Sequence, residues 1–128
     1  MNSRERLKKV INHQIPDRIP IDFGSMRSVG ISTIAYNKIL AKLGIKNKLP
    51  RMYDFIQQLA YPEEEILKMF HVDTIDAGQA FLKSEDDLKT WILNDGTKCK
   101  IPKYLNIETD SSNTVYLKVF LFLFYLYI

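Results

Sequence analysis

Residues 2–24, NSRERLKKVINHQIPDRIPIDFG, form the stretch that decides the predicted fold. Its first half predicts a short amphipathic helix, which Asn2 and Glu5 begin with a capping box. A Pro-Asp-Arg turn then leads into an apolar strand, Ile19–Phe23, and a small polar loop begins at Gly24. In α/β enzymes the functional side chains gather at the carboxyl ends of strands. This order of elements therefore predicts an α/β protein with a site where its first strand ends.

The rest of the chain continues to alternate helices with short strands. Helical spacing covers residues 3–13 and 34–43, and a proline opens a third helix over residues 62–70. Residues 71–78 are typical of a strand with its exit loop, and residues 94–97 carry the Asp-Gly signal of a tight hairpin turn. Helices and strands joined by short connections indicate a layered α/β architecture.

Three further segments are predicted from weaker patterns. Residues 52–60 are interpreted as a short strand or irregular segment that turns helical, and residues 84–91 as a short helix that begins with a capping box. Residues 104–108 and 114–118 are expected to pair as a second hairpin across a polar turn.

The composition is that of a globular domain. The 128 residues suffice for one domain with a core, and the apolar (46%) and charged (26%) fractions are ordinary. A net charge of +3, with lysines scattered among acids, gives no reason to expect nucleic acid as a partner. The single cysteine, Cys99, excludes an internal disulfide and a Cys–Cys metal pair. The polar N-terminus lacks the apolar core of a signal peptide, so a cytoplasmic location is expected.

The last fourteen residues differ from the rest of the sequence. From Val115 to Ile128 only Lys118 is charged, and residues 119–128 are all apolar or aromatic. A membrane-spanning helix needs about 20 such residues, so no membrane span is expected, although a membrane-associating segment is one alternative. Phe, Leu, Tyr, Ile and Lys can all be encoded by adenine and thymine alone. We therefore expect a partial domain over residues 1–114, followed by an aberrant tail over residues 115–128 that a frameshift would explain.

The loop after the first strand holds the candidate binding residues. It contains a carboxylate (Asp22), a permissive backbone position (Gly24), a hydroxyl (Ser25) and a guanidinium (Arg27). The planar fork of arginine suits a substrate carboxylate, because it donates two parallel charge-assisted hydrogen bonds. The alternative is an ordinary loop whose arginine lies on the surface.

Other reactive side chains suggest structural roles. Asp73 and Asp76 lie three apart near a strand end and point in different directions, so at least one is expected to stabilise a turn. His13 and His71 both follow helices and are expected to cap them. Cys99 is expected to be buried. None of these residues has the spacing of a metal site, so no metal ligand and no catalytic residue are assigned.

The segment from Met52 to Phe55, with Gln57 and Gln58, allows two interpretations. Its aromatic and amide side chains could line an apolar pocket with polar anchors, or they could belong to the core and a helix cap. The sequence has no phosphate loop, nucleophile elbow, kinase motif or dinucleotide fingerprint.

Four segments in order resemble the N-terminal part of the uroporphyrinogen decarboxylase (URO-D) family: NSRERLKKVINHQIPDRIPIDFG, GISTIAYNKILAKLGI, PRMYDFIQQLAYPEEEILKMFHVDTIDAG and WILNDGTKCKIPKYLNIE. The resemblance covers residues 2–108 and is strongest to the branch of corrinoid-dependent methyltransferases. It implies an α/β fold, the N-terminal portion of a (β/α)₈ TIM barrel. The barrel would be incomplete, because a whole one takes about 250 residues.

The resemblance also implies two kinds of chemistry. Decarboxylase members of the family are lyases of porphyrin biosynthesis, which remove carboxyl groups from the acetate arms of a tetrapyrrole without a cofactor. Methyltransferase members move methyl groups between a cobalt corrinoid and an acceptor such as a thiol, and they use zinc. The expected partner is thus a tetrapyrrole or a methyl donor. No cofactor is expected in this chain, because the zinc ligands of such relatives lie in the later half of the barrel.

Only one site residue carries over from the family. The decarboxylase motif Met-Arg-x-x-Gly-Arg matches residues 26–30, so the resemblance assigns Arg27 to substrate carboxylates, but Ile31 replaces the second arginine. The catalytic aspartate should fall near Gln79 and Ala80, where no acid stands. These departures argue against true uroporphyrinogen decarboxylation.

We therefore expect a truncated URO-D-family protein that is inactive alone. The alternatives are a small binding or accessory module, or one half of a split enzyme whose second chain supplies the rest of the barrel.

Overall fold

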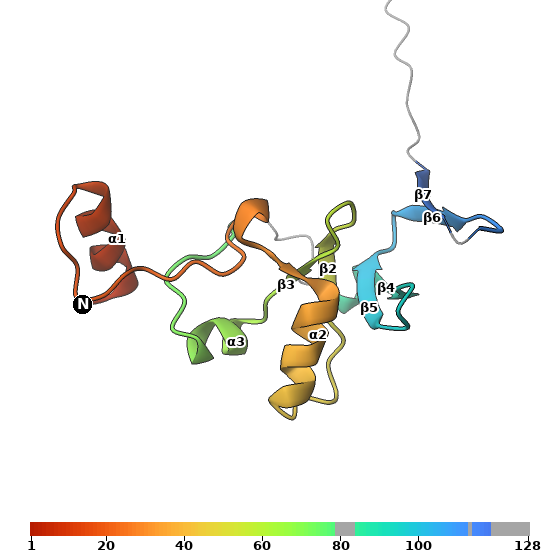
Figure 1. Ribbon diagram of the computed structural model, residues 1–128, viewed down its shortest axis with the longest axis horizontal. Helices are drawn as coiled ribbons and strands as arrows, with labels where there is room; N and C mark the ends of the chain where they lie inside the picture. The colour runs from red at the N-terminus through yellow and green to blue at the C-terminus, as the bar shows by residue number, and fades with distance from the viewer. Residues whose placement is uncertain (79–83, 113, 119–128) are drawn as a thin grey trace, which may run out of the picture.

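The computed structural model of the protein describes residues 1–78, 84–112 and 114–118. The molecule is elongated, with the N-terminal helix at one end and two β-hairpins at the other (Figure 1). Its elements in chain order are α1 (Ser3–Ile11), η1 (Arg27–Val29), β1 (Ile31–Ser32), α2 (Thr33–Lys42), β2 (Arg51–Asp54), β3 (Leu59–Tyr61), α3 (Glu64–Met69), η3 (Glu85–Asp87), β4 (Leu88–Ile92), β5 (Lys98–Pro102), β6 (Asn106–Thr109) and β7 (Val115–Lys118).

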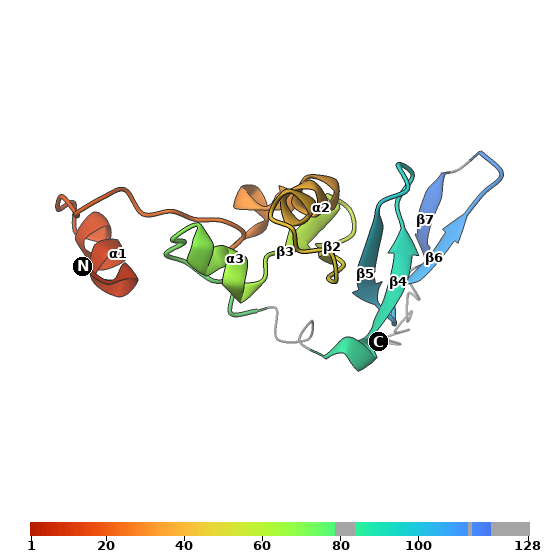
Figure 2. The ribbon, with the colours of Figure 1, turned by 90° about the horizontal axis from the view of Figure 1, so that it is seen from below.

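The strands form one mixed sheet and one separate hairpin. The order in the five-stranded sheet is β1-β3-β2-β5-β4, and β6 pairs with β7 in a sheet of their own. Neighbouring strands are antiparallel except for β2 and β5, which run parallel with Arg51 opposite Lys100. Figure 2 shows the β4–β5 and β6–β7 hairpins next to one another at one end of the molecule.

The prediction of the N-terminal portion of a (β/α)₈ barrel is wrong. In that fold each strand is parallel to its neighbours, because a helix crosses over between them. Here β2 is joined to β3, and β4 to β5, by tight turns that force antiparallel pairing. The described residues form a small mixed-sheet domain instead.

Two predicted strands are also absent, although their residues lie side by side. Residues 19–23 and 71–78 are assigned to no strand. Pro20 has no N–H to donate to a sheet ladder. The two segments nevertheless meet where the N–H of Asp73 donates to the carbonyl of Ile21 at 2.8 Å. The two segments therefore lie next to one another without forming strands.

The other elements follow local signals to different degrees. The helices α1 and α2 and both C-terminal hairpins confirm the predictions. Asn2 and Glu5 form the capping box of α1, with N···O distances of 2.8 and 3.0 Å. Residues 52–60 form the β2–β3 hairpin rather than a segment that turns helical. Residues 84–91 form a short 3-10 turn and then enter β4 rather than a helix.

The core consists of two clusters that meet along β2. Tyr36 and Leu40 of α2 pack with residues of β3 and α3 in the first cluster. Met52 of β2 packs with residues of the β4–β5 hairpin in the second cluster, which Ile107 of β6 also contacts. β2 is hydrogen-bonded to β3 on one side and to β5 on the other, so it joins the two halves. Within the described ranges, no helix has the length and apolar character needed to cross a bilayer.

Candidate functional site

Asp22 organises the loop that the sequence singled out. One carboxylate oxygen accepts from the backbone N–H of Ser25 at 3.1 Å, and the other accepts from the Ser25 hydroxyl at 2.6 Å. The hydroxyl of Thr74 donates to Asp22 at 2.7 Å, which ties the loop to the neighbouring extended segment. Burial by itself raises the pKa of Asp22. The hydrogen bonds from Ser25 and Thr74 have the opposite and larger effect, so the pKa lies below its ordinary value. Asp22 and Ser25 thus hold the loop in shape.

Gly24 is required by the backbone of this loop. Its φ of +88° lies in the left-handed region, which residues with a side chain rarely adopt. Its N–H donates to the carbonyl of Val29 at 3.1 Å and closes the loop. A Cβ at this position would lie 3.1 Å from two ring atoms of Pro62, so the loop packs closely on the start of α3. Gly24 therefore positions the loop and offers no side chain to a ligand.

Arg27 is the exposed cation that this loop presents. It begins η1, and its Nε lies 2.9 Å from a carboxylate oxygen of Asp54. The Arg27 side chain is 71% exposed, whereas that of Asp54 is 5% exposed and also accepts from the N–H of Gln57. The buried carboxylate fixes the base of the guanidinium, and most of the arginine side chain remains open to solvent. This arrangement suits the binding of an anionic group.

Tyr53 lies beside Arg27, and the environment of its hydroxyl group is unusual. Its hydroxyl is buried and has no hydrogen-bond partner among the described residues. A Cβ on Gly30 would lie 3.2 Å from that hydroxyl and 3.3 Å from the carbonyl oxygen of Arg27. Burial, followed by the nearby negative charges of Asp54 and Asp76, raises the pKa of Tyr53. The phenol therefore stays neutral at ordinary pH.

The structure partly decides between the two interpretations of residues 52–58, a pocket lining or a part of the core. Met52 lies in the core and is 1% exposed. Gln57 and Gln58 lie exposed in the turn between β2 and β3. The amides and Met52 therefore do not line one common pocket. Asp54 is the polar residue of this segment that contributes to the candidate site, through its ion pair with Arg27.

Asp73 has a structural role, although in an ion-pair network rather than in a turn. Asp76 has the turn role expected of at least one of the two aspartates, because its carboxylate accepts from the N–H of Gly78 at 2.7 Å. The side chain of Asp73 is fully buried, where it pairs with Arg6 of α1 and with Arg18 at 2.7 Å. It also accepts from the N–H of Ile21 at 2.9 Å. Burial alone would raise the pKa of Asp73, but the hydrogen bonds from Ile21, Ser3 and the two arginines hold it well below its ordinary value. This network fastens the N-terminal segment to the rest of the molecule.

The histidines and the cysteine also occupy structural positions. His13 and His71 each follow a helix end with a positive φ, of 55° and 53°, and each donates its N–H to a carbonyl of the preceding turn. Cys99 is fully buried, and burial raises its pKa to about 11, so its thiol stays protonated.

No place for zinc is evident in the part of the chain that the structure describes. Groups of three or more His, Cys, Asp or Glu side chains that could hold a metal ion are absent there. The zinc that the resemblance to URO-D methyltransferases implies therefore has no group of ligands among the described residues. The position expected for the family's catalytic aspartate, near Gln79 and Ala80, lies outside the described residues.

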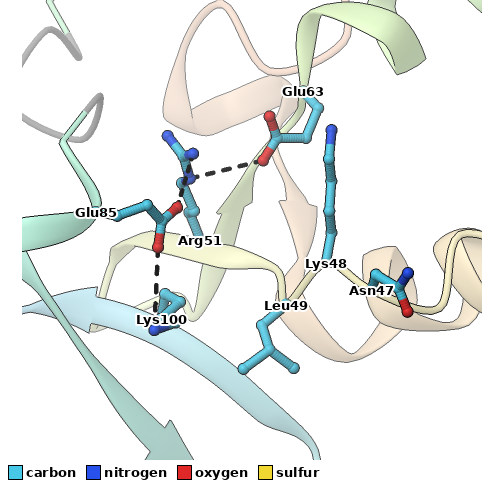
Figure 3. A pocket seen from close by; sticks show the side chains of 7 residues that line it. All are labelled: Asn47, Lys48, Leu49, Arg51, Glu63, Glu85 and Lys100. Atoms are coloured by element: carbon cyan, nitrogen blue, oxygen red, sulfur yellow. Dashed lines mark hydrogen bonds and ion pairs between the residues drawn. The ribbon is translucent and has the colours of Figure 1, made fainter.

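The structure adds a second feature that the sequence did not indicate. A hollow of about 330 Å³ lies between the two halves of the molecule, and Figure 3 shows its charged lining. Lys48, Arg51 and Lys100 supply positive charge, and Glu63 and Glu85 supply negative charge. The loop before β2 carries Lys46 and Lys48. Its proximity to β5 depends on the parallel pairing of β2 with β5, for which no local signal exists.

Comparisons of this chain with protein families, with curated proteins and with solved structures give no match.

Proposed function

We propose that this chain is a small binding module, in which the Asp22–Arg27 loop takes a carboxylate group of its ligand. More specifically, we propose kinship with the URO-D family and a polycarboxylate tetrapyrrole as the ligand, with no catalysis by the chain alone. The observation that carries the proposal is the exposed guanidinium of Arg27, which the buried Asp54 holds in place. The four URO-D-like segments of the sequence support the choice of ligand.

The chemistry of the loop fits this role. Asp22 and Ser25 are hydrogen-bonded to one another, and Gly24 closes the loop through its backbone, so the loop is formed before a ligand arrives. A preformed site avoids the entropic cost of ordering a loop on binding. The proposal concerns the ligand of this loop and is independent of the barrel, which the mixed sheet excludes.

Titration with uroporphyrin, the stable oxidised tetrapyrrole with eight carboxylates, tests the proposal. We expect saturable binding to the wild-type chain, about tenfold weakening by Arg27→Gln, and no change by Arg4→Gln. Arg4 is an exposed residue of α1, so its replacement makes the same change in charge away from the loop. Absence of binding, or equal weakening by the two variants, would refute the proposal.

An accessory module that associates with another chain is the second candidate. Three isoleucines of the N-terminal segment, Ile11, Ile15 and Ile19, are 74%, 89% and 83% exposed. Large apolar side chains that are exposed within one short segment can mark a protein contact surface. Analytical ultracentrifugation tests whether this surface joins two copies: Ile15→Ser should weaken self-association and Ile56→Ser, at an equally exposed site on the β2–β3 turn, should not. A chain that remains monomeric up to about 0.5 mM would count against this candidate.

A further inference from the structure

The charged hollow between the two halves of the molecule is lined by no residue of the Asp22–Arg27 loop. Its wall comes from the loop before β2, the start of β2, the residue before α3, η3 and the middle of β5. Lys100 reaches this position because its N–H donates to the carbonyl of Pro50 at 2.8 Å, next to the parallel pair of Arg51 with Lys100. At about 330 Å³, the hollow is at the lower end of the range for small-molecule sites.

Opposite charges alternate around this hollow. Arg51 is 20% exposed and lies between two carboxylates, with an Nη 2.9 Å from Glu85 and Nε 3.6 Å from Glu63. Lys100 lies 3.9 Å from the other oxygen of Glu85 (Figure 3). Lys48 projects from the loop before β2 and pairs at 2.7 Å with Glu65. The close-up shows Arg51, Glu85 and Lys100 in a row, with Glu63 across from them.

Several of these ion pairs are weak enough for a ligand to replace them. The contacts at 3.6 and 3.9 Å are longer than a good hydrogen bond, which is about 2.7–3.2 Å between heavy atoms. Lys48 and Glu65 are each about half exposed, and such surface pairs contribute little stability. A bound carboxylate can therefore recruit the ammonium group of Lys48 or Lys100, and a bound ammonium group can recruit the carboxylate of Glu63.

We propose that this hollow binds a small zwitterion of the amino-acid class. The carboxylate of the ligand lies toward Lys100, and its ammonium group lies toward Glu63, across the hollow from Lys100 (Figure 3). A simple anion would meet the two carboxylates of the wall, and a simple cation would meet the two lysines and Arg51, so a ligand that carries both charges matches the lining better. This proposal is independent of the tetrapyrrole proposal.

Amide NMR titration with three probes tests whether the hollow binds a zwitterion. L-glutamine carries both charges, succinate carries only negative charge, and 1,4-diaminobutane carries only positive charge. Up to about 10 mM, we expect L-glutamine to shift the amides of residues 47–51, 63, 85 and 100 in a saturable manner. The other two probes should bind at least about tenfold more weakly. Absence of a saturable shift with L-glutamine, or equal affinity for succinate, would overturn the proposal.

Matched variants locate the two charges of the ligand. Lys100→Gln and Glu63→Gln should each weaken L-glutamine binding about tenfold, because each removes one side of the charge match. Lys8→Gln, on the exposed side of α1, makes the same change in charge as Lys100→Gln and should leave the affinity unchanged. Circular dichroism of each variant checks that it is folded. If Lys8→Gln and Lys100→Gln weaken binding equally, net charge rather than the hollow determines the interaction.

Discussion

Asp73 is the residue on which the contacts of the N-terminal segment converge. Its buried carboxylate receives hydrogen bonds from Arg6, Arg18 and the N–H of Ile21. We expect Asp73→Asn to destabilise the protein by about 3 kcal/mol, because it leaves the buried guanidinium of Arg6 without one of its charge partners. Urea unfolding measures the change, and Asp86→Asn, at an exposed position in η3, is the control.

The ionisation of Asp73 also makes the stability of the protein depend on pH. The pKa of Asp73 in the folded protein lies below its value in the unfolded chain, so the unfolded chain takes up a proton more readily as the pH falls. The contribution of Asp73 is therefore complete above about pH 5 and is lost progressively as the pH falls below about 4. Urea midpoints at several pH values should show this loss in the wild type and a smaller loss in Asp73→Asn. Parallel curves for the two proteins would contradict the assignment.

Alanine substitutions at Gly24 and Gly44 distinguish the effect of backbone strain from that of steric crowding. Both have positive φ, of +88° and +76°, but a Cβ on Gly24 would meet Pro62 at 3.1 Å, whereas a Cβ on Gly44 would meet nothing within 4 Å. We expect Gly44→Ala to lower the free energy of unfolding by about 1 kcal/mol, because of backbone strain. Gly24→Ala should lower it by a further amount of about 1 kcal/mol or more, because the new Cβ also meets Pro62. Thermal unfolding measures both variants. A smaller effect at Gly24 would mean that the loop and Pro62 move apart easily.

At the scale of elements, Tyr36 connects α2 with α3. It is fully buried, and its hydroxyl accepts from the N–H of Glu63, the N-cap residue just before α3, at 2.9 Å. Tyr36→Phe leaves this N–H without its partner, and we expect a loss of about 1–2 kcal/mol. Amide exchange at residues 63–66 should accelerate more than exchange in β4 and β5. Tyr104→Phe, at a 70% exposed position, should change neither quantity.

The elements that could be predicted are those with a complete local signal. The capping box identified α1, helical spacing identified α2, and Asp95-Gly96 identified the turn between β4 and β5. The β2–β3 hairpin was missed because its turn has none of the usual turn residues. Gln58 adopts a φ of +54° there, a conformation that sequence patterns assign to Gly or Asn.

The candidate site could be predicted only in part for a related reason. The loop Asp22–Arg27 was identified because small and polar residues follow an apolar run. Its ion-pair partner Asp54 is distant in sequence, and that pairing depends on the β2–β3 hairpin. The charged hollow depends on the parallel contact of β2 with β5, which is also long-range. Local patterns therefore indicated which residues were exposed and polar, but not which of them meet.

At the scale of the whole molecule, β2 couples two small cores. It pairs with β3 beside the cluster of Tyr36 and Leu40, and it contributes Met52 to the cluster of the β4–β5 hairpin. We therefore expect both halves to unfold together. The fluorescence of Trp91, which packs against the second cluster, and far-UV circular dichroism, which reports mainly on the helices, should give the same urea midpoint. Separate midpoints would show that the halves are independent.

The most direct test of the central claim is an amide NMR titration of the wild-type chain with uroporphyrin. If the Asp22–Arg27 loop binds a carboxylate, saturable shifts should appear at residues 24–30 and at Asp54, and the amides of the charged hollow at residues 47–51 should remain unchanged. Shifts confined to the hollow, or no saturable shift at all, would contradict the account.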